Sequence, residues 1–313
     1  MSAWLGLDAV PADLGPSVVT IGVFDGVHRG HQVIIGEAVR RAHADGLPCV
    51  VLTFDPHPLA VLRPKVQPAT LLSLDDRVSA LMALGADGVC VLPFTHELSA
   101  LEPEEFVRQV LVDGLHTAGV VVGANFHFGH RAAGDIATLV ELGEKGGFWV
   151  ESIGLSGDGA TYSSTRVREL VQLGQVKEAS RVLGRPHRLV APVVHGDHRG
   201  RTLGFPTANL AQDRLVAVPA DGVYAGWLVR SGGERLPAAV SVGTNPTFDG
   251  RKRRVEAYVL DRTDLDLYGE QVAVEFVDRL RPTERFDSAD DLVEQMRRDV
   301  EKARSLLRAP AAG

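Results

Sequence analysis

Hydrophobic patterning changes once along this chain of 313 residues, and the change restricts the folds that it can adopt. Up to about residue 153, short apolar runs alternate with amphipathic stretches at helical spacing. From Leu189 onward, apolar runs follow one another across turns that contain Gly and Pro, with no helical pattern between them. The first pattern is typical of a parallel sheet covered on both faces, and the second of an antiparallel barrel or sandwich. The sequence therefore predicts an α/β domain followed by a β domain.

The expected elements follow from the spacing of apolar residues. In the first part, strands are expected at residues 18–24, 49–54, 89–92, 120–122 and 148–153, and helices at 31–45, 74–84, 103–112 and 136–145. Another helix is expected to begin near Ser164. In the second part, strands are expected at 189–195, 223–229, 237–243, 255–260 and 271–280. A C-terminal helix is expected after its N-cap Ser288, with an apolar face of Leu292, Met296, Val300, Ala303 and Leu307.

A domain boundary is expected at residues 184–186, where the last helical pattern gives way to the first strand of the second part. The predicted domains are therefore 1–186 and 187–313, a division that the length of the chain also favours. Charge supports the same division, because the first domain carries the whole net charge of −7 and the second is balanced.

Composition excludes several classes of function. The acidic net charge is unlike that of a nucleic-acid binder. No apolar run approaches the roughly 18 residues of a membrane helix, and the N-terminus lacks the order of a signal peptide. The two cysteines, Cys49 and Cys90, lie in apolar runs and are expected to be buried, reduced thiols. We expect a cytoplasmic protein with no nucleic-acid or membrane partner; a weak homo-oligomer is allowed by the sequence.

The segment GVFDGVHRGH joins the first predicted strand to the first predicted helix. Such a junction is where parallel α/β sheets bind phosphates, and glycines let the backbone approach the ligand. Two histidines within one turn can donate hydrogen bonds to a polyphosphate, although such a pair alone is a weak signal. Zinc is disfavoured because no further ligand cluster accompanies the pair. The candidate residues are Gly22, Phe24, Asp25 and Gly26, followed by His28 and His31.

Three further segments are expected at the same edge of the sheet. Ser164 and Thr165 open a helix with Arg168 just inside it, which combines N–H dipoles with a cation, although these hydroxyls also suit a simple cap. Asn125 follows the strand expected at 120–122. FDPHP lies at the end of the strand expected at 49–54 and contributes Phe54, Pro56, His57 and Pro58.

Taken in this order, GVFDGVHRGH, TFDPHP, VGANFHFG and SSTRVR resemble the Rossmann-like adenylyltransferase module of prokaryotic bifunctional FAD synthetases. The resemblance implies that FMN reacts with ATP to give FAD and pyrophosphate. The attacking phosphate is already ionised, so the site must orient and neutralise charge, the role implied for His28, His31 and Arg168. Phe54, Pro56, His57, Pro58 and Asn125 are the implied flavin contacts. This chain has Tyr162 before the two serines, where the family more often has an aliphatic residue.

The second candidate site follows the boundary, where HGDHRGRTLGFPTANL contains three glycines, Gly196, Gly200 and Gly204. No P-loop motif occurs in the chain. A Gly-rich turn is usually only a turn, but Thr207 and Asn209 are two residues apart and would share one face of an extended segment. Their hydroxyl and amide could hold Mg²⁺ and phosphate oxygens. Glu256, on the strand expected at 255–260, is by pattern alone a solvated face residue.

This set resembles riboflavin kinase, in which PTAN follows a GR-x-LGFP loop, and the resemblance extends to RLRPTERFDSADDL. It assigns the catalytic carboxylate to Glu256. A carboxylate suits this reaction because the acceptor is an alcohol of high pKa. The whole chain thus resembles enzymes that use ATP and Mg²⁺ to convert riboflavin to FMN and FMN to FAD, with these small molecules as partners.

Three alternatives remain open. One module alone could be active, or the chain could be a flavin- or nucleotide-binding regulatory protein without turnover. The retained Glu256 argues against the regulatory alternative, because binding a flavin has little need of a base. A cytidylyltransferase of small alcohols would share HRGH but would leave the second domain unexplained.

Overall fold

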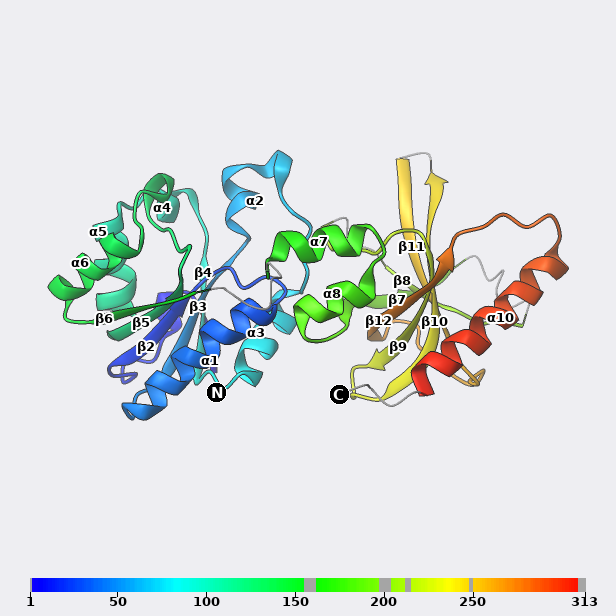
Figure 1. The fold of residues 1–313 in the computed structure, drawn as a ribbon, viewed down its shortest axis with the longest axis horizontal. Helices are drawn as coiled ribbons and strands as arrows, with labels where there is room; N and C mark the ends of the chain where they lie inside the picture. The colour runs from blue at the N-terminus through cyan, green and yellow to red at the C-terminus, as the bar shows by residue number, and fades with distance from the viewer. Residues whose placement is uncertain (1, 155–161, 197–203, 212–214, 248–249, 309–313) are drawn as a thin grey trace. The chain divides into compact units, whose positions relative to one another are not determined.

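A computed structural model describes residues 2–154, 162–196, 204–211, 215–247 and 250–308 of the chain. The chain forms two compact units (Figure 1). The first contains Met1–Pro68 and Ser73–Ser163, and the second contains Ala69–Leu72 and Ser164–Gly313.

The first unit contains a six-stranded parallel sheet with the strand order β1-β4-β3-β2-β5-β6. Its strands are β1 (Ser2–Leu5), β2 (Ser17–Ile21), β3 (Cys49–Asp55), β4 (Gly88–Pro93), β5 (Thr117–Gly123) and β6 (Trp149–Ile153). The predicted α/β architecture is confirmed. Strand β2 ends three residues earlier than predicted, because Phe24 has a φ of +50° that an extended strand cannot contain.

Helices cover both faces of this sheet. They are α1 (Arg29–Ala44), α2 (Pro58–Leu62), α3 (Leu74–Ala83), α4 (His96–Ser99), α5 (Pro103–Phe106), the π-helical segment η3 (Val107–Gly114) and α6 (Ile136–Gly146), with 3₁₀ turns η1 (Leu7–Ala9), η2 (Pro64–Val66) and η4 (His130–Ala132). The residues of β2 alternate between the two layers. Val19 joins the apolar cluster of η3 and α6, whereas Val18 packs against Ile34 and Ala38 of α1. Both thiols are buried and free, as predicted.

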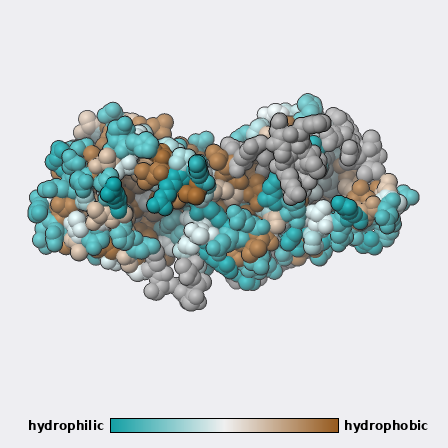
Figure 2. Space-filling view, turned by 90° about the horizontal axis from the view of Figure 1, so that it is seen from above, coloured by the Kyte–Doolittle hydropathy of each residue, from teal (hydrophilic) through white to brown (hydrophobic). Residues whose placement is uncertain are grey.

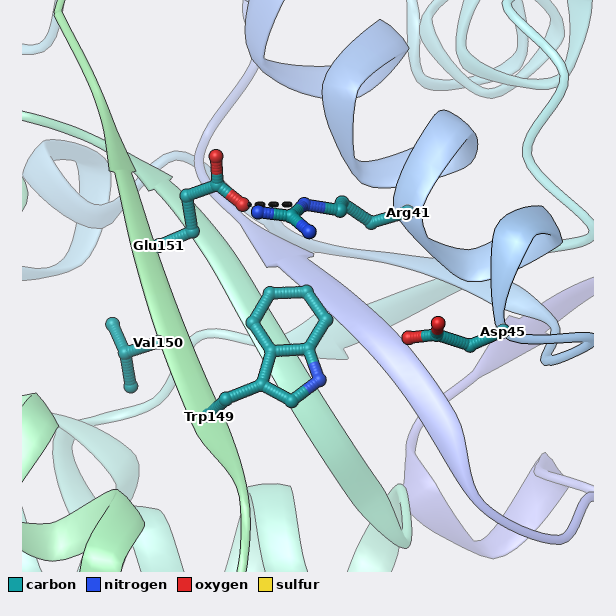
Figure 3. Close-up of a pocket in the computed structure, with 5 residues that line it drawn as sticks. All are labelled: Arg41, Asp45, Trp149, Val150 and Glu151. Atoms are coloured by element: carbon teal, nitrogen blue, oxygen red, sulfur yellow. Dashed lines mark hydrogen bonds and ion pairs between the residues drawn. The ribbon is translucent and has the colours of Figure 1, made fainter.

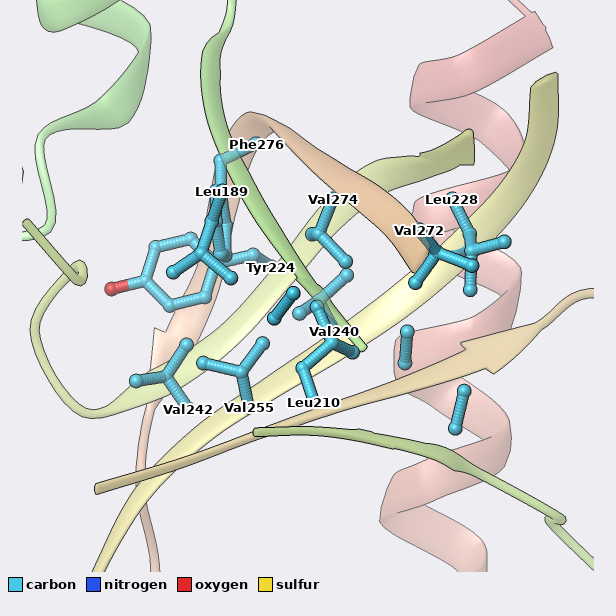
Figure 4. Close-up of a cluster of buried hydrophobic side chains, with 14 of the residues drawn as sticks. Leu189, Leu210, Tyr224, Leu228, Val240, Val242, Val255, Val272, Val274 and Phe276 are labelled. Carbon is cyan, nitrogen blue, oxygen red and sulfur yellow. The ribbon is translucent and has the colours of Figure 1, made fainter. Parts of the chain in front are cut away.

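The second unit contains a closed antiparallel barrel with the strand order β10-β11-β8-β7-β12-β9. Its strands are β7 (His187–Val194), β8 (Ala208–Leu210), β9 (Gly222–Arg230), β10 (Arg235–Thr247), β11 (Gly250–Val259) and β12 (Gln271–Pro282). Alternate residues point inward and fill the barrel with aliphatic side chains around Tyr224 and Phe276 (Figure 4). The predicted β domain is therefore a barrel, and the short strand β8 was not predicted.

The second unit also contains the helices α7 (Ser164–Gln172), α8 (Val176–Leu183) and α10 (Ala289–Arg308); α8 and α10 pack on the barrel strands, and α7 packs against α8. Ser288 caps α10 as predicted, because its Oγ accepts a hydrogen bond from the N–H of Asp291 at 3.1 Å. Val300, Ala303 and Leu307 of α10 pack in an apolar cluster with residues of the barrel wall. Val176 of α8 is fully buried in the barrel core. The boundary at 184–186 stays a prediction, since packing groups α7 and α8 with the barrel.

The surface mixes hydrophilic and hydrophobic residues on the face shown in Figure 2. Exposed large apolar side chains include Leu5, Val66 and Leu173. None of the helices in the described ranges combines the length and the apolar character that a membrane span requires.

Candidate functional site

The order of the parallel strands reverses beside β2 in the first unit. The chain runs from β2 to β3 and β4 on one side, and then returns to β5 on the other side of β2. Parallel α/β sheets bind ligands beyond the carboxyl ends of the strands at such a reversal. Residues 22–26 leave the end of β2, and Asn125 follows the end of β5 with its side chain exposed. The fold therefore brings these two predicted segments to one edge of the sheet.

The turn after β2 is tightly folded. Gly26 has a φ of +83°, and Phe24 and Val27 also lie in the left-handed region. A Cβ on Gly22 would come within 2.9 Å of the Phe24 ring, so only glycine fits there. Phe24 and Asp25 are only 2% and 3% exposed. Both side chains help to shape the turn, and their contact with a nucleotide stays a prediction.

His28 and His31 form a stacked pair at the start of α1. His28 is the N-cap, and its Nδ1 accepts a hydrogen bond from the N–H of His31 at 3.3 Å. The ring centroids are 3.6 Å apart, and Phe24 packs edge-on against His31. Since Nδ1 of His28 is an acceptor, the proton of the neutral ring lies on Nε2, which can donate to a ligand. Among the described residues, Nδ1 of His31 has no hydrogen-bond partner and is buried.

Burial determines the charge of this pair. It lowers the pKa of His28 to about 4, although a backbone hydrogen bond opposes the shift. Burial also lowers the pKa of His31 well below its ordinary value, and the neighbouring His28 lowers it further. Both rings are therefore neutral at pH 7 in the protein without ligand, and they act as hydrogen-bond donors rather than as fixed charges.

The FDPHP segment begins with the last two residues of β3, Phe54 and Asp55, and leads into α2. Phe54 packs edge-on against Phe94, with ring centroids 5.8 Å apart. Nδ1 of His57 accepts from the N–H of Leu59 at 3.1 Å, which caps α2, and Pro58 is the first residue of this helix. Pro56 is exposed. His57 thus has a structural role at a helix N-terminus, while the predicted flavin contacts of the segment stay predictions.

The predicted residues of α7 belong to the second unit. Ser164 is the first residue of this helix, Thr165 is exposed, and Nε of Arg168 donates to the carbonyl of Ala69 at 2.7 Å. The preceding Tyr162 belongs to the first unit, where its Cβ lies 3.2 Å from the position that a Cβ on Gly30 would take. The structure does not place the three α7 residues in one unit with His28 and His31, so their shared site stays a prediction.

The second candidate site lies on the outer face of the barrel. Asn209 of β8 and Glu256 of β11 are directly paired in the antiparallel register. Their neighbours Ala208, Leu210, Val255 and Ala257 point into the barrel core, so Asn209 and Glu256 share the outward face. The structure thus brings together an amide and a carboxylate that are 47 residues apart in the chain.

The loops around this pair are shaped by glycine and by close approach. A Cβ on Gly196 would lie 2.3 Å from Nδ2 of Asn209, so the main chain passes directly over that amide. Asn209 Nδ2 donates to the carbonyl of Thr207 at 3.4 Å. Gly204 has a φ of +86°, a conformation that favours glycine. The predicted Gly200 lies outside the described residues.

Two residues near the sites were not predicted. Ser241 of β10 is paired with Glu256 on the side opposite to Asn209. Arg77 of α3 is buried and donates to the main chain of the turn after β2 and to that of Phe54 near the end of β3. The sequence contained one signal for Arg77. It lies four positions before the apolar Leu81, so the two share the helix face that is buried.

A shallow pocket of about 450 Å³ lies near the amino end of β6, away from the carboxyl ends of the strands where the predicted segments lie (Figure 3). Trp149 begins β6, and Arg41 and Asp45 lie at the C-terminal end of α1. Arg41 Nε donates to Glu151 Oε2 at 2.7 Å, and its guanidinium lies 5.6 Å from the centre of the Trp149 ring. The pocket contains none of the predicted site residues.

Within the described ranges, no group of three or more His, Cys, Asp or Glu side chains could hold a metal ion. The oxygen-bearing set of Thr207, Asn209 and Glu256 is of the kind that Mg²⁺ uses, since this ion binds to one or two protein oxygens and otherwise to water and substrate phosphates. These residues therefore fit a magnesium ion that is brought by a nucleotide.

Comparisons with known proteins cover both units. A model of the FAD synthetase family matches residues 10–166, and a model of the riboflavin kinase family matches residues 183–307. A bifunctional riboflavin kinase/FMN adenylyltransferase of Pseudomonas fluorescens is 39% identical over 297 residues, which cover 94% of each chain. The enzyme of the same description from Listeria monocytogenes is 36% identical over 293 residues, 93% of this chain and 92% of its own.

The fold is also similar to that of a solved structure. A crystal structure described as a macrolide-efflux protein from Streptococcus pneumoniae has a TM-score of 0.88 and 33% sequence identity. The match covers 96% of this chain and 98% of that chain. Both units of this chain therefore have a counterpart within one solved polypeptide.

Proposed function

This chain belongs to the bifunctional riboflavin kinase/FMN adenylyltransferase family, and on that premise we propose how its residues divide the two reactions. The kinase reaction transfers a phosphoryl group from ATP to riboflavin and gives FMN and ADP. The second reaction transfers the adenylyl group of another ATP to FMN and gives FAD and pyrophosphate. The register pairing of Asn209 with Glu256 on the barrel is the observation that carries the residue assignment.

Glu256 serves the kinase reaction. Its carboxylate accepts the proton of the riboflavin hydroxyl as the oxygen attacks the γ-phosphorus of ATP, and ADP leaves. Asn209 is held next to it by strand pairing, and Thr207 directly precedes β8. Thr207 and Asn209 would hold Mg²⁺, which supplies positive charge to the phosphate oxygens when bound. Gly196 and Gly204 let the neighbouring main chain approach the nucleotide.

His28 and His31 serve adenylyl transfer. No base is needed, because the FMN phosphate that attacks the α-phosphorus of ATP is already ionised. The neutral ring of His28 donates from Nε2 at the N-terminus of α1, where the helix dipole also favours an anion. Arg168 supplies the formal positive charge for the departing pyrophosphate. Asn125, Ser164 and Thr165 orient the nucleotide and the flavin.

We place the enzyme in the cytoplasm, where its partners are ATP, riboflavin and FMN. Buried, free thiols at Cys49 and Cys90 support a reducing compartment. Burial raises the pKa of Cys49 to about 12 and that of Cys90 to about 11, so neither thiol is a reactive nucleophile at neutral pH.

Incubation of the purified protein with riboflavin, ATP and Mg²⁺, followed by chromatographic separation of the flavins, tests the proposal. FMN should appear first and FAD afterwards. FMN without FAD would leave only the kinase module active, and unchanged riboflavin would favour a flavin-binding protein without turnover.

A further inference from the structure

Arg77 is a buried cation in the first turn of α3. The residue is 5% exposed. Nη1 donates to the carbonyl of Val23 at 3.2 Å, and Nη2 donates to the carbonyl of Phe54 at 3.0 Å. Nη2 also lies 3.2 Å from Oδ1 of Asp55. One guanidinium therefore bonds to the main chain of the turn after β2 and to the last two residues of β3.

The turn after β2 and the end of β3 both carry predicted substrate contacts of the first unit. Val23 belongs to the turn that leads from β2 to His28, and Phe54 is the penultimate residue of β3, where FDPHP begins. The hydroxyl of Thr53 donates to the same Val23 carbonyl at 3.0 Å, so two donors hold this one oxygen. Arg77 thus joins the turn after β2 to the end of β3.

Burial of the Arg77 guanidinium is an inefficient way to stabilise the fold alone. Removal of a guanidinium from water is costly, and burial lowers the pKa of Arg77 even though Asp55 and Asp25 oppose the shift. Nε is buried and has no hydrogen-bond partner among the described residues. Arginine is nevertheless the side chain that can reach two carbonyls at once, because its planar fork presents several donors in fixed directions.

We propose that Arg77 is a positioning residue for adenylyl transfer, which aligns FMN with the α-phosphate of ATP by fixing the turn before His28 against the end of β3, where FDPHP begins. The inference rests on the proposed function and adds to it a residue that touches neither substrate.

Steady-state kinetics of the full chain test this role. Arg77→Met keeps the length of the side chain but removes its charge and its donors. We expect kcat/KM for FMN adenylylation to fall about 10²-fold, mainly in kcat, since a misplacement of about 1 Å costs about that much. Riboflavin phosphorylation by the same molecules should be unchanged. Arg77→Lys keeps the charge without the fork and should recover part of the lost kcat.

Arg281→Met is the matched control. Arg281 donates from Nη2 to Asp299 at 2.8 Å in a buried ion pair of the second unit, far from any predicted adenylylation residue in the sequence. This variant should be less stable but should adenylylate FMN at the wild-type kcat. An unchanged kcat per folded molecule in Arg77→Met, with folding checked by circular dichroism, would overturn the inference alone. Wild-type protein that makes no FAD from FMN would overturn the proposed function and this inference with it.

Discussion

Replacement of His28 by Asn should remove a pH dependence of stability that the buried ring creates. In the folded protein, burial lowers the pKa of His28 from 6.5 to about 4. As pH falls below 6.5, the unfolded chain therefore takes up a proton that the folded protein excludes, and the free energy of unfolding falls. At about 1.4 kcal/mol per pKa unit, the loss between pH 7 and pH 4 is about 3 kcal/mol. Asn is a good N-cap that does not titrate, so it keeps the acceptor at the start of α1.

Urea unfolding at a series of pH values from 7 to 4 measures this difference. Trp4 and Trp149 lie in the first unit, and the third tryptophan, Trp227, lies in the second. Trp227→Phe is therefore introduced into both the His28 protein and the His28→Asn variant, so that tryptophan fluorescence reports unfolding of the first unit alone. The two proteins should have similar free energies of unfolding at pH 7, and the Asn variant should be more stable by about 3 kcal/mol at pH 4. Curves that stay parallel to within about 0.5 kcal/mol over this range would refute a buried, neutral His28.

Three further predictions separate the two activities and the two units. Glu256→Gln should lower riboflavin phosphorylation by about 10²–10⁴-fold, the usual effect of a lost general base, while supplied FMN is still converted to FAD; wild-type phosphorylation would show that the carboxylate is misassigned. His28→Ala with His31→Ala should lower FAD formation about 10²–10³-fold and leave FMN formation near normal, and an equal loss of both would contradict two separate sites. A fragment of residues 187–313 should phosphorylate riboflavin but should unfold at a lower urea concentration than a fragment of residues 164–313. The reason is that loss of the buried Val176 alone costs roughly 2 kcal/mol; equal unfolding midpoints would show that α8 does not stabilise the barrel.

Elements with a strong repeating pattern could be predicted from the sequence. Strand β3 was expected at 49–54 and spans Cys49–Asp55, and α6 was expected at 136–145 and spans Ile136–Gly146. Strand β1 was not predicted, because its four residues, of which only Trp4 is buried, are too few to show a repeating pattern. The helix expected at 103–112 is an α-helical turn followed by the π-helical η3, a difference that apolar spacing does not reveal.

The candidate sites were predictable where chemistry and local order coincide. His28 and His31 lie within one turn, so their proximity follows from the start of a helix. Their low pKa values were not predictable, because burial depends on residues from elsewhere in the chain. The same is true of Arg77, whose carbonyl partners are 54 and 23 residues away in the sequence.

The two packing units do not divide the chain where helical patterning gives way to strand patterning. Residues 69–72 lie within the sequence of the first unit but pack in the second, where the N–H of Thr70 donates to the carbonyl of Leu215 at 2.6 Å and the N–H of Ala217 donates to the carbonyl of Thr70 at 2.9 Å. These bonds join main-chain groups, which every residue except proline can offer, so no side-chain pattern marks them. A boundary at 186 therefore records where helical spacing ends, whereas the contacts of Thr70 and the burial of Val176 extend the barrel unit to residues before that point.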